Sequence, residues 1–185
     1  MFPLGKWLRL TSEAKGIKLL RHPLVSTSEN NIFSKSSLVD LMRQGEIRFS
    51  KEHEWLAEKG EGIATMGISD FAQKQLGDIV SVDLPRVGSA YNRMQPLAVV
   101  DSVKSSSDIY SAVSGEVVEV NEELIEHPEF INQSPYDLGW IVKIKLSNTK
   151  EFEQLMSEEE YIVFIGEIEK KEKESTDMPS DGRSK

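Results

Sequence analysis

The chain of 185 residues contains no cysteine. This absence excludes disulfides, thiolate metal sites and a cysteine nucleophile, so any sulfur redox chemistry must come from an attached group. No apolar run approaches the roughly 20 residues of a membrane-spanning helix, so we expect no membrane association. The only histidines, His22, His53 and His127, lack the spacing of a metal site.

Basic residues are scarce outside the N-terminal part of the chain. Residues 1–48 contain eight Lys and Arg against four Asp and Glu, whereas residues 49–185 contain 14 against 27. Because an acidic body does not neutralise phosphates, we expect no nucleic-acid partner. Its charge suits soluble protein partners instead. With 38% hydrophobic and 29% charged residues, the chain is expected to form one small globular domain with tails, as a monomer.

Residues 1–46 are basic, partly amphipathic, rich in hydroxyl side chains and poor in acids. This composition is typical of an organelle transit peptide, whereas a secretory signal needs a continuous apolar centre. A short basic extension without a targeting role is the alternative. We therefore leave residues 1–46 out of the predicted fold.

Short strand-like runs separated by turn residues begin at Ile47. The main ones are residues 47–49, 55–57, 62–68, 79–85, 96–100, 109–113, 115–120 and 139–146. Because no long helical crossover separates them, a small antiparallel sandwich or barrel is favoured over a parallel sheet. Between two of these runs, residues 69–77 predict a two-turn helix with Ser69 as its N-cap and Gly77 at its end.

The C-terminal part changes character twice. Residues 149–168 contain helix formers with Phe152, Leu155 and Met156 at helical spacing, which predicts one or two helices packed on the sheet. Residues 169–185 are acidic and polar without apolar spacing and are predicted to be disordered. The domain is therefore expected to span residues 47–168.

Lys104 is the most informative residue of the chain. It lies in a small polar segment, Asp101–Asp108, between two β-branched runs, and this pattern predicts a hairpin with the amine at its tip. The small serine side chains around Lys104 would leave room for the pocket of a modifying enzyme. We expect Val103 to point inward and anchor the turn. An ordinary solvated turn lysine is the alternative.

Ordered blocks on both sides of Lys104 resemble those of the glycine cleavage system H protein family. These blocks include residues 51–55, 66–73, 76–80, 82–85, 101–105, 107–110, 113–121 and 139–145. The resemblance implies a mainly β fold with short helices, the barrel-sandwich hybrid or hammerhead of lipoyl-carrier domains, with C-terminal helices. It also implies that Lys104 bears lipoate as an amide, on a carrier subunit that is not itself an enzyme.

The resemblance further implies the partners of such a carrier. In the family, glycine decarboxylase loads an aminomethyl group onto the lipoyl arm, and aminomethyltransferase passes the one-carbon unit to tetrahydrofolate. Dihydrolipoamide dehydrogenase then reoxidises the arm, and a lipoate-attaching enzyme is needed to install it. Together with the basic extension, the family's usual location in eukaryotes implies the mitochondrial matrix.

A surface cleft that shelters the loaded arm is also implied, with Glu54 and Asp108 as carboxylates for its cationic amine. The alternatives are that Glu54 is an exposed acid on a strand and that Asp108 caps the turn. Gln75 stands where some family members carry histidine, so no histidine role is expected there. Met94 occupies a turn that usually contains glycine, which implies either a different turn or local backbone strain.

Two further expectations stay open on the sequence alone. Trp55, Tyr110 and Trp140 are expected in the core rather than in the walls of the cleft. A lipoyl relay that supplies lipoate to other lipoyl enzymes is an alternative function, and an unmodified interaction module is a third.

Overall fold

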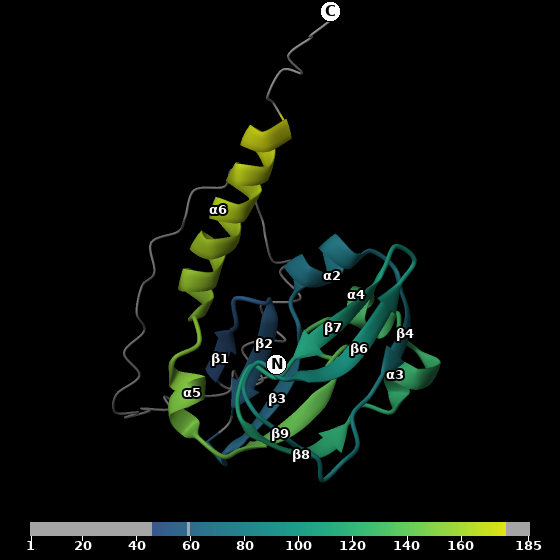
Figure 1. The fold of residues 1–185 in the computed structure, drawn as a ribbon, viewed down its shortest axis with the longest axis vertical. Coiled ribbons are helices and arrows are strands. Elements are labelled where there is room, and N and C mark those ends of the chain that lie inside the picture. Colours follow the sequence, from purple (N-terminus) through teal and green to yellow (C-terminus); the bar gives the residue numbers. More distant parts are fainter. Residues whose placement is uncertain (1–45, 59, 177–185) are drawn as a thin grey trace, which may run out of the picture. The chain divides into compact units, whose positions relative to one another are not determined.

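The computed structural model describes residues 46–58 and 60–176. The predicted transit peptide, apart from its last residue, and the end of the predicted tail lie outside these residues. Two antiparallel sheets and a set of mostly short helices make up the fold (Figure 1). The antiparallel sandwich predicted from the strand pattern is therefore confirmed.

The larger sheet has six strands in the order β1-β2-β3-β9-β8-β5. These strands are β1 (Glu46–Phe49), β2 (Glu54–Glu58), β3 (Ile63–Ile68), β5 (Ala90–Tyr91), β8 (Gly115–Val120) and β9 (Val142–Leu146). The smaller sheet has the order β4-β6-β7, formed by β4 (Ile79–Asp83), β6 (Pro96–Ser102) and β7 (Ser106–Tyr110). Every pair of neighbouring strands is antiparallel.

Apolar residues from both sheets form the main core. Met66 of β3 and Ile144 of β9 are fully buried, as is Val100 of the smaller sheet. The period-2 alternation of β9 leaves Lys145 exposed while Ile144 faces the core. This strand is shorter than predicted at its N-terminal end, because the N–H of Gly139 donates to the carbonyl of Ser134 (2.8 Å) and closes a turn there.

The helices are α2 (Asp70–Leu76), α3 (Glu123–Glu126), α4 (Phe130–Gln133), α5 (Thr149–Glu153) and α6 (Glu158–Thr176). The α2 prediction is confirmed at both ends. The hydroxyl of Ser69 accepts a hydrogen bond from the N–H of Ala72 (3.2 Å), and Gly77 ends the helix with a positive φ of 82°. An N-cap serine and a C-terminal glycine are what helix ends require, since they satisfy or accommodate the unpaired backbone groups.

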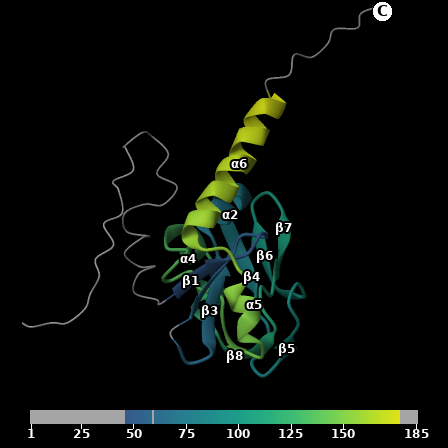
Figure 2. The same cartoon turned by 90° about the vertical axis from the view of Figure 1, so that its left-hand side faces the viewer.

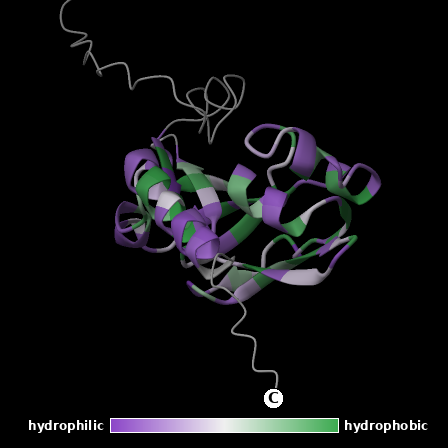
Figure 3. Cartoon of the chain, turned by 90° about the horizontal axis from the view of Figure 1, so that it is seen from above, coloured by the Kyte–Doolittle hydropathy of each residue, from purple (hydrophilic) through white to green (hydrophobic). Residues whose placement is uncertain are grey.

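Helix α6 corrects the predicted tail, because it continues through residues 169–176, where we expected disorder. Glu and Lys are strong helix formers, and Lys170 pairs with Glu174 one turn later, with Nζ and Oε1 3.9 Å apart. The C-terminal half of α6 projects beyond the sheets (Figures 1 and 2). Hydrophilic residues predominate on its outward turns (Figure 3). Within residues 46–58 and 60–176, no helix has the length and apolar character needed to cross a bilayer.

The N-terminal half of α6 closes a second apolar cluster. Tyr161 and Ile165 are fully buried there together with Phe49 and Trp55. The rings of Phe49 and Tyr161 stack with centroids 4.3 Å apart and planes 7° from parallel. Trp55 donates its Nε1–H to the carbonyl of Pro135 (3.0 Å), so its polar atom is satisfied inside the cluster. This cluster attaches α6 to the edge of the larger sheet that carries β1 and β2.

Candidate functional site

Lys104 lies at the tip of the hairpin between β6 and β7, as predicted, and is exposed. The side chain of Ser102 builds this turn. Its Oγ atom accepts hydrogen bonds from the N–H groups of Lys104 and Ser105, each at 3.1 Å. The N–H of Ser102 also donates to the carbonyl of Ser105 (2.8 Å). A serine that folds the chain back on itself holds the backbone of the tip, while Lys104 as a whole stays exposed.

Val103 departs from its prediction. Its side chain is 64% exposed and does not point inward. The turn is anchored by the backbone instead, because the N–H of Val103 donates to the carbonyl of Asp78 (3.0 Å). This bond joins the hairpin to the segment that follows α2. Exposed Val103 therefore offers apolar surface beside the amine rather than packing beneath it.

Asp101 ties the base of the hairpin to β4. The Oγ atom of Ser81 donates to Oδ2 of Asp101 at 2.7 Å. Hydrogen bonds from Ser106 and Ser81 hold the pKa of Asp101 below its ordinary value. The carboxylate of Asp101 thus contacts a residue of its own sheet.

A cleft of about 320 Å³ opens beside the hairpin. Its walls come from β2, the end of β3, α2, β7 and α6. The apolar lining residues are Ile68, Phe71, Ala72, Leu76, Ile109 and Ile168, and the polar ones are Glu52, His53, Glu54, Gln75, Ser107, Asp108 and Glu172. An apolar slot with carboxylates at its walls is suited to a ligand with a hydrocarbon chain and a cationic end.

Glu54 is buried in the wall of this cleft, with 2% of its surface exposed. Its Oε1 atom accepts from the N–H of Tyr110 (3.2 Å), and the hydroxyl of Ser50 donates to Oε2. Burial raises the pKa of Glu54, and the hydrogen bond from Ser50 opposes that rise. The alternative of an exposed strand acid is therefore excluded.

Asp108 lines the same cleft from β7, opposite Val99 of β6 in the register of the sheet, and is exposed. Among residues 46–58 and 60–176 no side-chain hydrogen bond of Asp108 is found, so its carboxylate does not cap the turn there. Ser102 has that role. The structure brings Glu54 and Asp108 to one cleft from different sheets, and Gln75 of α2 lines it as well.

His53 is a cleft residue that the sequence did not indicate. Its Nδ1 atom lies 2.9 Å from the hydroxyl of Tyr161, which lies 2.7 Å from the hydroxyl of Ser69. Its ring contacts that of Phe71, with centroids 4.7 Å apart. Burial lowers the pKa of His53, which favours the neutral imidazole. The His53 backbone has a positive φ of 75°, and no local signal predicts this.

The aromatic residues predicted in the core divide into two groups. Trp55 is fully buried, which confirms its prediction. Tyr110 and Trp140 are only half-buried, and neither lines the cleft. Trp140 lies under the ammonium of Lys143, which is 4.9 Å from the ring centroid. Contact with a surface cation explains why this indole stays at the protein surface.

Met94 adopts a positive φ of 66° in the turn before β6. Of the two alternatives for this turn, local backbone strain is therefore the one found. Its N–H donates to the carbonyl of Ser111 (2.7 Å), which keeps the turn in place. A side chain in this region of backbone space costs about 1 kcal/mol relative to glycine.

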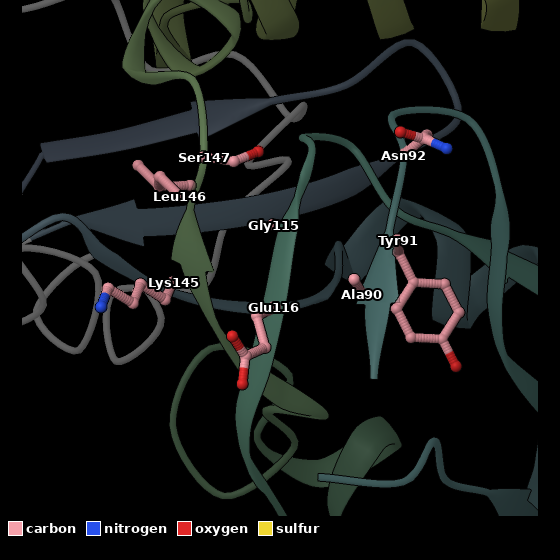
Figure 4. A pocket seen from close by; sticks show the side chains of 8 residues that line it. All are labelled: Ala90, Tyr91, Asn92, Gly115, Glu116, Lys145, Leu146 and Ser147. Atoms are coloured by element: carbon pink, nitrogen blue, oxygen red, sulfur yellow. The ribbon is translucent and has the colours of Figure 1, made fainter. Parts of the chain in front are cut away.

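A second hollow lies where β5, β8 and β9 meet (Figure 4). It is lined by Ala90, Tyr91, Asn92, Gly115, Glu116, Lys145, Leu146 and Ser147. Glu116 and Lys145 are partners in the register of β8 and β9, so the charges on this surface lie opposite each other. None of the predicted site residues belongs to this hollow.

Comparison with known proteins gives one consistent result. The family model described as glycine cleavage H-protein matches residues 47–168. The glycine cleavage system H protein of Halothermothrix orenii is 50% identical over 123 residues, which cover 66% of this chain and 95% of that protein. The protein of the same name from Coprothermobacter proteolyticus is 53% identical over 121 residues, covering 65% and 95%.

A solved structure agrees with these sequence matches. The crystal structure of a glycine cleavage system H protein from Mycobacterium marinum superimposes with a TM-score of 0.59 at 30% identity. It covers 66% of this chain and 98% of that one. The region that the family model matches contains the hairpin, the first half of α6 and every residue of the cleft lining except Glu172.

Proposed function

The chain belongs to the glycine cleavage H-protein family, and from this premise we propose that Lys104 is the residue through which it carries lipoate. As a member of this family it is a lipoyl carrier of glycine cleavage, and this membership favours that role over a lipoyl relay. One observation supports the assignment to Lys104 most strongly. Its amine is exposed at the tip of a turn whose backbone is held by Ser102 and by the bond from Val103 to Asp78.

The cleft beside the hairpin suits the attached group. Leu76, Ile109 and Ile168 offer apolar surface for a hydrocarbon chain, and Glu54 and Asp108 offer negative charge for an amine. When bound, lipoate would supply the disulfide that takes up the aminomethyl group and is thereby reduced, so that a dithiol remains after the group has been passed on. The chain's own contribution is to hold the arm at Lys104, to shelter its far end from water and to pair its positive charge.

Glu54 is the better placed of the two carboxylates for this pairing. Because it is buried, a cation beside it is screened little by water, and the cation would in turn favour the ionised carboxylate. The backbone N–H of Tyr110 and the hydroxyl of Ser50 hold the carboxyl group in place. Glu54→Gln keeps the shape of the side chain but removes its charge, so the aminomethyl load should be lost faster. An unchanged lifetime of the load would return Glu54 to a structural role.

The protein is proposed to act without catalysing a step itself. Its partners would be glycine decarboxylase, aminomethyltransferase, dihydrolipoamide dehydrogenase and a lipoate-attaching enzyme. The acidic body and the exposed Val103 next to Lys104 support contact with such protein partners at the hairpin.

Mass analysis of the lipoylated protein tests the attachment site. We expect the lipoyl mass on the peptide that contains Lys104, and we expect Lys104→Arg to lose both this mass and support of glycine decarboxylation. Lys74→Arg is the matched control, because Lys74 is also an exposed lysine, on α2, and it pairs with Asp70. A Lys104→Arg protein that still supports full decarboxylation would overturn the assignment.

The location in the mitochondrial matrix is part of the same proposal. It is supported by the basic, acid-poor composition of residues 1–46, which lie almost wholly outside the described residues. A reporter fused to residues 1–46 should enter mitochondria, and the reporter alone should not. A diffuse cytosolic signal from the fusion would reject the targeting role.

A further inference from the structure

The side chain of Lys104 lies directly over Gly77, the residue that ends α2. A Cβ atom placed on Gly77 would be 3.2 Å from Cε of Lys104, 3.3 Å from Nζ and 3.6 Å from Cδ. Contacts between 3.0 and 3.4 Å are tighter than nearly all those that Cβ atoms make, so the lysine would have to move. The missing side chain at position 77 is therefore the space that the Lys104 stem occupies.

The backbone beneath the stem has little freedom to move away. The amide of Asn132, on α4, donates to the carbonyl of Gly77 (3.0 Å) and to the side-chain oxygen of Gln73 (2.8 Å). The Oδ1 atom of Asn132 also accepts from the N–H of Ile79 (2.9 Å). One half-buried amide thus holds the chain before and after Gly77, and satisfied amide networks of this kind make a segment rigid.

The hairpin is tied to the same segment from the other side. The carbonyl of Asp78, next to Gly77, accepts the N–H of Val103, next to Lys104 (3.0 Å). On the far side of Gly77, Leu76 lines the cleft. Gly77 is consequently next in the chain to a residue of the cleft wall and close to the outer atoms of the Lys104 side chain.

We propose that Gly77 is a positioning residue for the modified lysine. Because Gly77 has no side chain, it leaves the space through which the Lys104 side chain runs from the hairpin tip toward the cleft. The proposal rests on the proposed function, since it takes Lys104 as the lysine that carries the arm. In this proposal, Gly77 determines where the Lys104 side chain lies, although Gly77 itself binds neither the aminomethyl group nor a partner protein.

A pair of glycine variants separates this role from ordinary backbone strain. Gly77 has φ of 82° and Gly88 has φ of 85°, and a Cβ at Gly88 would meet nothing within 4 Å. Gly77→Ala and Gly88→Ala should therefore both lower the unfolding midpoint, because both place alanine at a positive φ. Only Gly77→Ala adds a side chain under the lysine.

The decisive measurement compares both lipoylated variants with the lipoylated wild-type chain. Gly77→Ala should shorten the lifetime of the aminomethyl load by roughly fivefold, since a small misplacement of a bound group has large effects. Gly88→Ala should leave the lifetime unchanged. Equal lifetimes in the two variants would overturn the role of Gly77. Lack of lipoylation on wild-type Lys104 would instead overturn the proposed function, so the two failures are distinguishable.

A second measurement needs neither a variant nor the attached group. In the unmodified wild-type chain, nuclear Overhauser effects should connect the ε protons of Lys104 to the α protons of Gly77. The exposed Lys74, also on α2, should show no such contact to Gly77 and serves as the internal control. Absence of the Lys104 contact would overturn the proposal even if the variants failed to fold.

Discussion

The Oε1 atom of Glu54 accepts a hydrogen bond from the backbone N–H of Tyr110, with the two atoms 3.2 Å apart. This bond joins β2 of the larger sheet to the end of β7 in the smaller one. It also holds a carboxyl group inside the wall of a cleft, where burial raises its pKa. A buried acid between two sheets links the stability of the fold to pH.

Glu54→Gln should change that pH dependence. Because the pKa of Glu54 is raised in the folded state, its contribution to stability is complete below the pKa of the unfolded chain, about 4.3, and is lost as pH rises through the folded pKa. Glutamine does not titrate. The free energy of unfolding of Glu54→Gln minus that of the wild-type chain should therefore increase as pH rises through this window.

Urea unfolding at a series of pH values measures this difference. His53 has a lowered pKa and so destabilises the folded chain as pH falls through the ordinary range of histidine, but it is present in both proteins and cancels in the difference. A difference that stays constant with pH would show that Glu54 does not titrate differently in the folded and unfolded chains.

Tyr161→Phe tests the hydroxyl that links α6 to the cleft. This hydroxyl lies within hydrogen-bond distance of Ser69 and of His53, so its loss removes one hydrogen-bond partner from each. We expect the free energy of unfolding to fall by about 1–2 kcal/mol. Ser69→Ala should also destabilise, by about 1 kcal/mol, because Ser69 caps α2.

The double variant Ser69→Ala/Tyr161→Phe completes a cycle, with stability measured by urea unfolding. It should lose less than the sum of the two single changes, because both remove the same hydrogen bond. Strict additivity would mean that the two hydroxyls do not interact.

Met94→Gly should stabilise the protein. Met94 has φ of 66°, and glycine adopts this conformation without the steric cost, so the free energy of unfolding should rise by about 1 kcal/mol. Arg93→Gly is the control at the neighbouring position, which does not have a positive φ. It should lower stability, because glycine there adds freedom to the unfolded chain and removes the hydrogen bond that Arg93 donates to Oε1 of Gln154 (3.2 Å). Equal effects at the two positions would contradict the strain at Met94.

Ile168→Asn tests whether α6 forms a wall of the cleft. Ile168 lines the cleft, whereas Val163 on the same helix is 63% exposed. A polar side chain at position 168 should weaken the apolar contact with the arm and speed the release of formaldehyde and ammonia from the loaded carrier several-fold. Val163→Asn should not change this rate. If both variants behave like the wild-type chain, α6 does not shelter the arm.

Patterns within a few neighbouring residues of the sequence were enough to predict helix α2 and the hairpin of Lys104. The capped helix α2 has its serine and glycine in sequence, and the hairpin of Lys104 has its polar turn between two β-branched strands. The extension of α6 to Thr176 was missed, because a charged segment without apolar spacing resembles a disordered tail. Helix propensity and an attached first half are enough to continue such a helix.

Side-chain directions at the site were less predictable. Val103 was expected to point inward, but the turn is held by its backbone and the side chain is exposed. Glu54 and Asp108 were named from the family resemblance, not from spacing, and 54 positions separate them along the chain. Their meeting at one cleft depends on how the two sheets pack, which no local pattern encodes.

The amino-acid sequence alone predicts a small antiparallel β domain, a lysine at a hairpin tip and no cysteine chemistry. These properties follow from composition, period-2 alternation and turn residues, which act over a few neighbours. The neighbours of that lysine and the lining of the cleft beside its hairpin depend on tertiary packing. Gly77 lies next to the Lys104 side chain and is held by Asn132, whereas His53 and Ile168 line the cleft. These residues come from separate helices and turns, which burial of the two apolar clusters brings close together.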